Sequence, residues 1–116
     1  MKKLGFLAVL NLFFLSLIPG CSKQQPAEHI KVVMKKYAFE PDVIKVKSGE
    51  LVEFEVSTAD VQHGFNIDDL GIKEPVNRGK PAVFTFKAPA KGEYKITCGI
   101  ICGPRHDDMK AKLVVE

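Results

Sequence analysis

The chain has no marked excess of charge of one sign. Its 17 lysines and arginines stand against 14 aspartates and glutamates, a formal net charge of +3 over 116 residues. Two of these basic residues, Lys2 and Lys3, lie in a segment that we expect to be removed, which leaves 15 against 14. Binding to a nucleic-acid backbone needs a concentration of basic side chains. We therefore expect no nucleic-acid partner.

The sequence also lacks an apolar run long enough to span a membrane. Its N-terminal run extends from Leu4 to Ile18, about 15 residues, whereas a spanning helix needs about 20. Lys2 and Lys3 precede the run and small residues follow it, which is the arrangement of an export signal. We predict a signal peptide over residues 1–20 and a mature protein facing the periplasm or the cell exterior. An uncleaved helical anchor and free secretion are the alternatives.

Cysteine is scarce, and its odd number excludes complete pairing within one chain. Of the three cysteines, Cys98 and Cys102 lie close together, and Cys21 directly follows the predicted signal. An odd cysteine in an exported protein requires an explanation. The segment Leu17-Ile18-Pro19-Gly20-Cys21 resembles a bacterial lipobox, in which the cysteine after the cleavage site is acylated. This resemblance implies a lipid anchor on Cys21, with residues 21–28 as a polar tether.

A convincing helical period is lacking as well, and the rest of the sequence alternates as strands do. Clear alternation of apolar and polar side chains occurs over residues 30–35, 44–47 and 52–56. Turn-forming residues separate these runs, and residues 68–81, which are rich in glycine and proline, are predicted to form a long loop. We predict one all-β domain over residues 29–116, an antiparallel sandwich of two sheets with about seven strands.

Alternation along the predicted strands places three possible metal ligands toward the core. His63, Cys98 and Met109 each share one side of a strand with apolar neighbours, and the connection after Cys98 adds Cys102 and His106. Each residue alone has an ordinary explanation as a core histidine, a packed methionine or a disulfide. Together, their thiol, imidazole and thioether donors suit a soft, redox-active metal, and copper fits the set best.

Other sites can be built from the same residues. Zinc could take two cysteines and two histidines, but this leaves Met109 without a role. A mononuclear blue-copper site would need Cys102, His106, Met109 and His63 but not Cys98. A copper delivery or storage protein would use the cluster for metal exchange. An enzyme is not expected, because a complete ligand set leaves no open position for substrate.

Two segments resemble a known family. The loop Cys98-Gly99-Ile100-Ile101-Cys102-Gly103-Pro104-Arg105-His106-Asp107-Asp108-Met109 closely resembles the copper-binding loop of cytochrome c oxidase subunit II, which reads C-x3-C-x3-H-x2-M. The segment Asp60-Val61-Gln62-His63-Gly64-Phe65 is similar to the segment that bears the first histidine of that family, and further similarity runs from Tyr37 to the last strand. The resemblance implies a cupredoxin-like Greek-key β-sandwich of about seven to eight strands.

The same resemblance implies a dinuclear CuA centre with two copper ions per chain. Two thiolates would bridge the metals, each metal would take one imidazole, and two weak ligands would be axial. By position, the bridging thiolates would be Cys98 and Cys102, and the imidazoles would be His63 and His106. The weak ligands would be Met109 and the carbonyl of Ile100. The implied function is single-electron transfer, with the unpaired electron shared over both metals.

The implied partner is a c-type cytochrome or a membrane redox complex. Oxidase members of the family usually have an acidic or amide residue where this chain has Ile100, and they use an aromatic patch that contains tryptophan, which this chain lacks. We therefore expect a stand-alone electron carrier, anchored by lipid outside the cytoplasmic membrane, rather than a conventional oxidase subunit.

Overall fold

The computed structural model describes residue 20 and residues 24–116. The predicted signal up to residue 19 and the predicted lipidation site Cys21 lie outside the described residues. Within the described part, no helix has the length and apolar character that crossing a membrane requires. The first strand begins at Glu28, which the sequence placed at the end of the tether.

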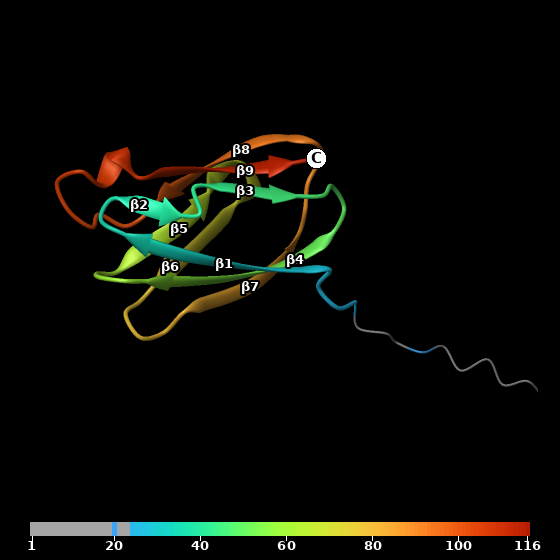
Figure 1. The fold of residues 1–116 in the computed structure, drawn as a ribbon, viewed down its shortest axis with the longest axis horizontal. Helices are drawn as coiled ribbons and strands as arrows, with labels where there is room; N and C mark the ends of the chain where they lie inside the picture. The colour runs from blue at the N-terminus through green and yellow to red at the C-terminus, as the bar shows by residue number, and fades with distance from the viewer. Residues whose placement is uncertain (1–19, 21–23) are drawn as a thin grey trace, which may run out of the picture.

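In the part of the chain that the structure describes, nine strands form two sheets that face each other (Figure 1). The four-stranded sheet has the order β2 (Ala38–Glu40), β1 (Glu28–Lys35), β4 (Leu51–Thr58) and β7 (Ala82–Lys87). The five-stranded sheet has the order β3 (Val43–Val46), β9 (Lys110–Val115), β8 (Gly92–Cys98), β5 (His63–Ile67) and β6 (Ile72–Val76). Two 3-10 turns, η1 (Asp68–Leu70) and η2 (His106–Asp108), complete the described elements. The all-β prediction is confirmed, with one or two strands more than expected.

The expectation of a purely antiparallel sandwich is wrong at two places. β1 runs parallel to β4, and β3 runs parallel to β9. Between β1 and β4 the chain leaves the four-stranded sheet to form β3 in the other one, and it then returns in the original direction. Side-chain alternation reports which face of a strand is buried, but it carries no information on strand direction.

The long loop predicted over residues 68–81 is also wrong in part, because this stretch contains η1 and β6. Pro75 lies within β6, which is the edge strand beside β5. Proline is accepted at a sheet edge because its missing N–H costs no hydrogen bond there. Val76 is fully buried and Ile72 is partly buried. The segment therefore has the alternation of a strand, although its glycine and proline residues indicated a loop.

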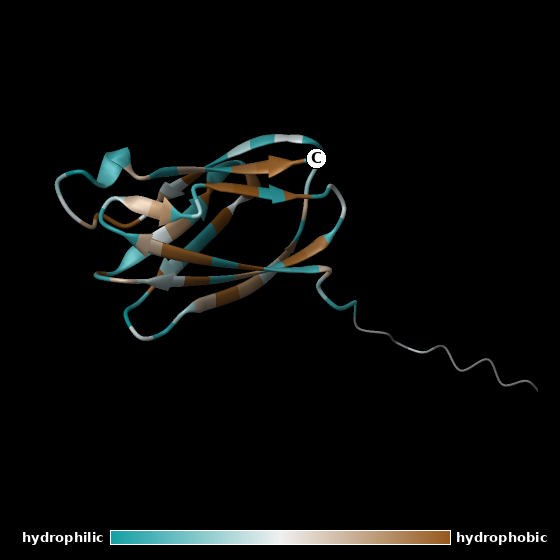
Figure 2. Cartoon of the chain, in the orientation of Figure 1, coloured by the Kyte–Doolittle hydropathy of each residue, from teal (hydrophilic) through white to brown (hydrophobic). Residues whose placement is uncertain are grey.

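The core lies between the two sheets, where the apolar side of each strand faces inward. Figure 2 shows apolar residues recurring along the strands on both sides of the sandwich. Phe54 occupies the centre, with its ring centroid 5.4 Å from that of Phe65 and 5.2 Å from that of Phe86. Burying each side chain of this size contributes about 1.5–3 kcal/mol. The packed sandwich is thus a firm support for residues at its ends.

Candidate metal centre

Three candidate ligands lie at one end of the five-stranded sheet. His63 is the first residue of β5, Cys98 is the last residue of β8, and Met109 directly precedes β9. β8 pairs with both of the other strands in antiparallel register, which brings these strand ends together. The predicted burial is confirmed, with exposed fractions of 0% for His63, 6% for Cys98 and 1% for Met109.

The two cysteine sulfurs lie in the middle of the cluster. Each has one imidazole nitrogen and one weaker potential metal ligand beside it, a carbonyl oxygen or a thioether sulfur. The Cys98 thiol lies 3.7 Å from His63 Nδ1 and donates to the Ile100 carbonyl at 3.1 Å. The Cys102 sulfur lies 3.8 Å from His106 Nδ1 and 3.5 Å from the sulfur of Met109. Both cysteines are free thiols.

The two halves of the cluster also lie close to each other. The donor atoms of His63, Cys98 and Cys102 are all within 4.8 Å of one another. Thus the structure brings together every residue that the sequence assigned to the site, from three strand ends and one loop. Their binding of a metal stays a prediction.

Asp60 holds the buried imidazole in one orientation. His63 Nε2 lies 2.8 Å from Asp60 Oδ1, and because a carboxylate accepts, the proton resides on Nε2. Nδ1 then keeps a free lone pair on the side of Cys98. Metal-binding histidines usually have such a carboxylate partner, which fixes the tautomer and the ring orientation. Asp60 was not among the predicted site residues, although its position three residues before a core-facing histidine was a usable signal.

The carboxylate of Asp60 is itself held from several sides. Its two oxygens accept the backbone N–H groups of Lys36 at 2.7 Å and of Val61 at 2.6 Å. Partial burial alone would raise the pKa of Asp60, but these hydrogen bonds and the one from His63 outweigh it and hold that pKa well below its usual range. Asp60 is therefore ionised at neutral pH.

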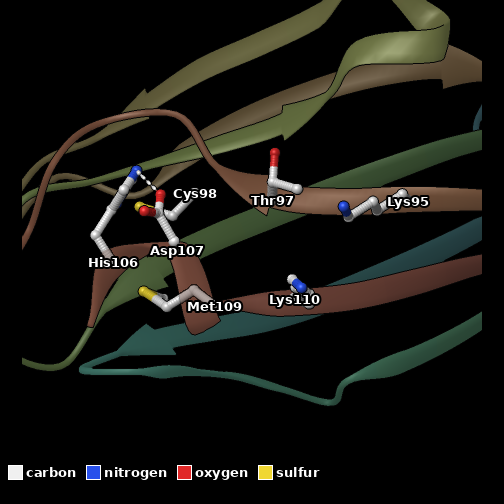
Figure 3. A pocket seen from close by; sticks show the side chains of 7 residues that line it. All are labelled: Lys95, Thr97, Cys98, His106, Asp107, Met109 and Lys110. Atoms are coloured by element: carbon white, nitrogen blue, oxygen red, sulfur yellow. Dashed lines mark ion pairs between the residues drawn. The ribbon is translucent and has the colours of Figure 1, made fainter.

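The second imidazole is held less firmly. His106 opens η2, retains 17% exposure of its side chain, and has its Nε2 4.0 Å from a carboxylate oxygen of Asp107 (Figure 3). That distance is too long for a hydrogen bond. The next contact in the turn joins Arg105 Nε to Asp108 at 2.9 Å. The site thus has one rigid, buried histidine and one histidine near solvent.

The thiol of Cys102 is hard to ionise in the metal-free chain. Burial, followed by the neighbouring Cys98 thiol, raises the pKa of Cys102 to about 11. Thiolate is the form that binds metals, so metal binding must release this proton.

Close backbone approaches at two glycines shape the ligand loop. A Cβ on Gly99 would overlap the side chain of Asn66 on β5. A Cβ on Gly103 would lie 2.5 Å from the hydroxyl of Tyr37, whose ring also has the Arg105 guanidinium 5.7 Å from its centroid. The loop therefore packs directly against β5 and against Tyr37.

Comparison with known proteins agrees with this architecture. The family model of the cupredoxin-like domain matches residues 5–115. The chain belongs to the cupredoxin-like family. Among curated proteins, cytochrome c oxidase subunit 2 of Thermus thermophilus is 33% identical over 89 residues, which are 75% of this chain and 64% of that protein. The same subunit of Synechocystis sp. is 29% identical and is matched over 27% of its length. The chain thus spans less than two thirds of these curated relatives.

Solved structures share the cupredoxin-like fold at low identity. The periplasmic domain of subunit II of cytochrome oxidase (CoxB) of Bradyrhizobium japonicum has a TM-score of 0.73 at 20% identity, covering 80% of this chain and 86% of that one. Auracyanin A, a blue copper protein from Chloroflexus aurantiacus, has a TM-score of 0.61 at 22% identity, covering 76% and 98%.

The donor chemistry of this cupredoxin-like domain fits copper. Thiolate and thioether sulfur and imidazole nitrogen are the ligands that copper electron-transfer sites use. The residues that could hold it are His63, Cys98, Ile100 through its carbonyl, Cys102, His106 and Met109.

Proposed function

We propose that this domain transfers single electrons through a dinuclear copper centre of the CuA type. One observation carries the proposal, namely that the two cysteine sulfurs divide the other donors evenly. Each sulfur has one imidazole Nδ1 at 3.7 or 3.8 Å and one weak donor at 3.1 or 3.5 Å. When bound, copper would supply a group that accepts and releases one electron.

The chain's own residues would keep the site rigid and dry. Asp60 fixes the His63 ring, and the buried side chains of Cys98 and Met109 keep water from the inner half. Fixed ligands limit the rearrangement that accompanies each electron transfer. His63, Cys98 and Met109 come from the ends of paired strands, so the sandwich itself sets the positions of these three donors.

A dinuclear site uses the whole cluster, whereas a mononuclear site does not. A single copper bound by Cys102, His106, Met109 and His63 would leave Cys98 idle. In the structure, however, the Cys98 sulfur lies 3.7 Å from His63 Nδ1 and 3.1 Å from the carbonyl oxygen of Ile100. This pairing supports Cys98 as a ligand.

The proposal includes the location and the partner. We infer that residues 1–20 direct export, that Cys21 carries lipid, and that residues 21–28 tether a domain formed by residues 29–116 outside the cytoplasmic membrane. The partner would be a c-type cytochrome or a membrane redox complex. Support comes from relatives that are cytochrome c oxidase subunits and from a similar fold in a heme-copper terminal oxidase dimer.

Copper content per chain tests this function. After reconstitution and removal of loose metal, we expect two copper ions per chain in the wild type and a lower count in Cys98→Ser. Cys21→Ser is the matched control, since it removes the remaining cysteine, the proposed lipid carrier, at a position far from the cluster in the sequence, and it should keep two. One copper per chain, unchanged by Cys98→Ser, would instead support a blue-copper site. Copper that passes freely to a competing chelator would support a delivery protein.

A further inference from the structure

The turn between β1 and β2 contacts the supports of both candidate histidines. It lies at the end of the sandwich that carries the ligand loop (Figure 1). The backbone N–H of Lys36 donates to Asp60 at 2.7 Å, and Asp60 lies 2.8 Å from His63 Nε2. The next residue, Tyr37, meets the ligand loop instead, where its phenol lies against Gly103. One turn, which contributes no candidate ligand, thus touches both halves of the site.

The contact of Tyr37 with Gly103 bears on the second histidine through the backbone. A Cβ on Gly103 would lie 2.5 Å from the Tyr37 hydroxyl and 3.2 Å from two ring carbons, so the ring occupies the space directly beside the glycine. The carbonyl of Gly103 accepts the backbone N–H of His106 at 3.1 Å, and the His106 carbonyl accepts that of Met109 at 3.2 Å. A shift of Gly103 would therefore be passed on to two candidate ligands.

Arg105 adds a second contact between the same ring and the loop. Its guanidinium carbon lies 5.7 Å from the centroid of the Tyr37 ring, which is within the range of cation–π attraction. Arg105 Nε also donates to Asp108 at 2.9 Å, but both of these side chains are more than half exposed, so that ion pair alone is weak. Tyr37 is half-buried and packs against the core, so its ring gives the exposed turn a fixed surface.

We propose that Tyr37 is a positioning residue that holds η2, and with it the His106 imidazole, in the geometry that a metal requires. The ring acts at two places, on the Gly103 backbone and on the Arg105 side chain. Unlike His63, His106 has no hydrogen-bonded carboxylate in the described part of the chain, so its position depends on the turn that carries it. Loss of a residue that orients a metal ligand lowers metal affinity about 10–100-fold. The inference rests on the proposed function and adds a residue that prepares its site.

Amide hydrogen exchange in the copper-free chain, read by NMR, tests this positioning. We expect Tyr37→Ala to speed exchange of the His106 and Met109 amides about tenfold, because the turn loses both of its contacts with the ring. Tyr94→Ala is the matched control. Tyr94 is the only other tyrosine, is also partly buried, and donates its hydroxyl to the Ala90 carbonyl at 2.7 Å, near the start of β8. After correction for global stability, this control should leave the two amides within about twofold of the wild type.

Copper retention gives a second measurement. Copper-loaded Tyr37→Ala should lose its metal to a chelator about tenfold faster than the wild type, whereas Tyr94→Ala should keep the wild-type rate. Arg105→Gln changes an exposed side chain and should leave folding intact, so it should show part of both effects. Tyr37→Phe keeps the ring and should stay within about twofold of the wild type in both measurements.

Two results would overturn the inference. Exchange at His106 and Met109 that is equally faster in Tyr37→Ala and Tyr94→Ala would show an effect of global stability and not of position. Unchanged exchange in Tyr37→Ala, or in Arg105→Gln should Tyr37→Ala not fold, would show that η2 holds its own geometry. Because the exchange measurement needs no copper, it can succeed where the copper count of the proposed function fails, and the reverse.

Discussion

At the residue scale, the main feature of the site is the unequal support of its two histidines. His63 is fully buried and hydrogen-bonded to Asp60, whereas His106 is partly exposed and lacks a hydrogen-bonded carboxylate among the described residues. We interpret His63 as the fixed reference of the site and His106 as its contact with the surroundings. A buried imidazole that keeps one tautomer needs its partner to remain ionised, which is the role of Asp60.

Replacing Asp60 should therefore change stability in a pH-dependent way. Its pKa is lowered in the folded chain, so its contribution is fully present above the usual aspartate pKa of about 4 and is lost as pH falls below that value. We expect Asp60→Asn to lower the free energy of unfolding of the copper-free chain by about 1–2 kcal/mol at pH 7. Urea unfolding at pH 7 and at pH 3 measures this difference.

The control for Asp60 is Asp68→Asn, since Asp68 is exposed at the start of η1 and takes no side-chain hydrogen bond in the described chain. It should change stability by less than about 0.5 kcal/mol at either pH. Equal effects of the two substitutions, or an Asp60→Asn penalty that is as large at pH 3 as at pH 7, would contradict the role given to Asp60.

At the element scale, the ligand loop depends on its packing against β5. Gly99 lies where any side chain would overlap Asn66, so the loop can leave β8 in its observed direction only with glycine there. Gly64 makes a similar approach on the neighbouring strand, where a Cβ would lie 3.0 Å from the backbone nitrogen of Ile100. The backbone that carries Ile100 and Cys102 is thus positioned by two small residues.

Adding a methyl group at Gly99 should displace the loop. We expect Gly99→Ala to destabilise the chain by about 1–3 kcal/mol and to weaken copper binding, because the new Cβ meets Asn66. The measurements are urea unfolding and a copper competition titration. Asn66→Ala in the same chain removes the obstructing side chain and should restore part of both quantities. A double variant no better than Gly99→Ala alone would show that the overlap is not the cause.

Strand alternation was enough to predict the inward positions of three candidate ligands, and the resemblance to cytochrome c oxidase subunit II supplied the rest of the predicted site. The inward positions of His63, Cys98 and Met109 follow from parity alone, because the side-chain period of a strand is two residues. The contacts of Asp60 with Lys36 could not be predicted, since they join segments 24 residues apart through a turn. β6 was missed because its edge position, which permits Pro75, is a property of the sheet and not of the segment.

At the scale of the whole molecule, the two sheets have different tasks. The four-stranded sheet has ion pairs between its own strands and supplies most of the inner phenylalanines, Phe54 among them. In the five-stranded sheet, His63, Cys98 and Met109 lie at or next to strand ends. The loop that bears the other candidate ligands connects two strands of the same sheet, β8 and β9. Parallel pairing of β3 with β9 could not be foreseen from alternation, yet it forms one edge of this sheet.

The most direct test of the central claim is the EPR spectrum of the copper-reconstituted chain. A dinuclear centre whose ligands are divided equally between the two sulfurs predicts hyperfine splitting from two equivalent copper nuclei. It also predicts one unpaired electron for every two copper ions. Splitting from a single copper nucleus, with one unpaired electron per metal, would contradict the account and favour a mononuclear site at the same end of the sandwich.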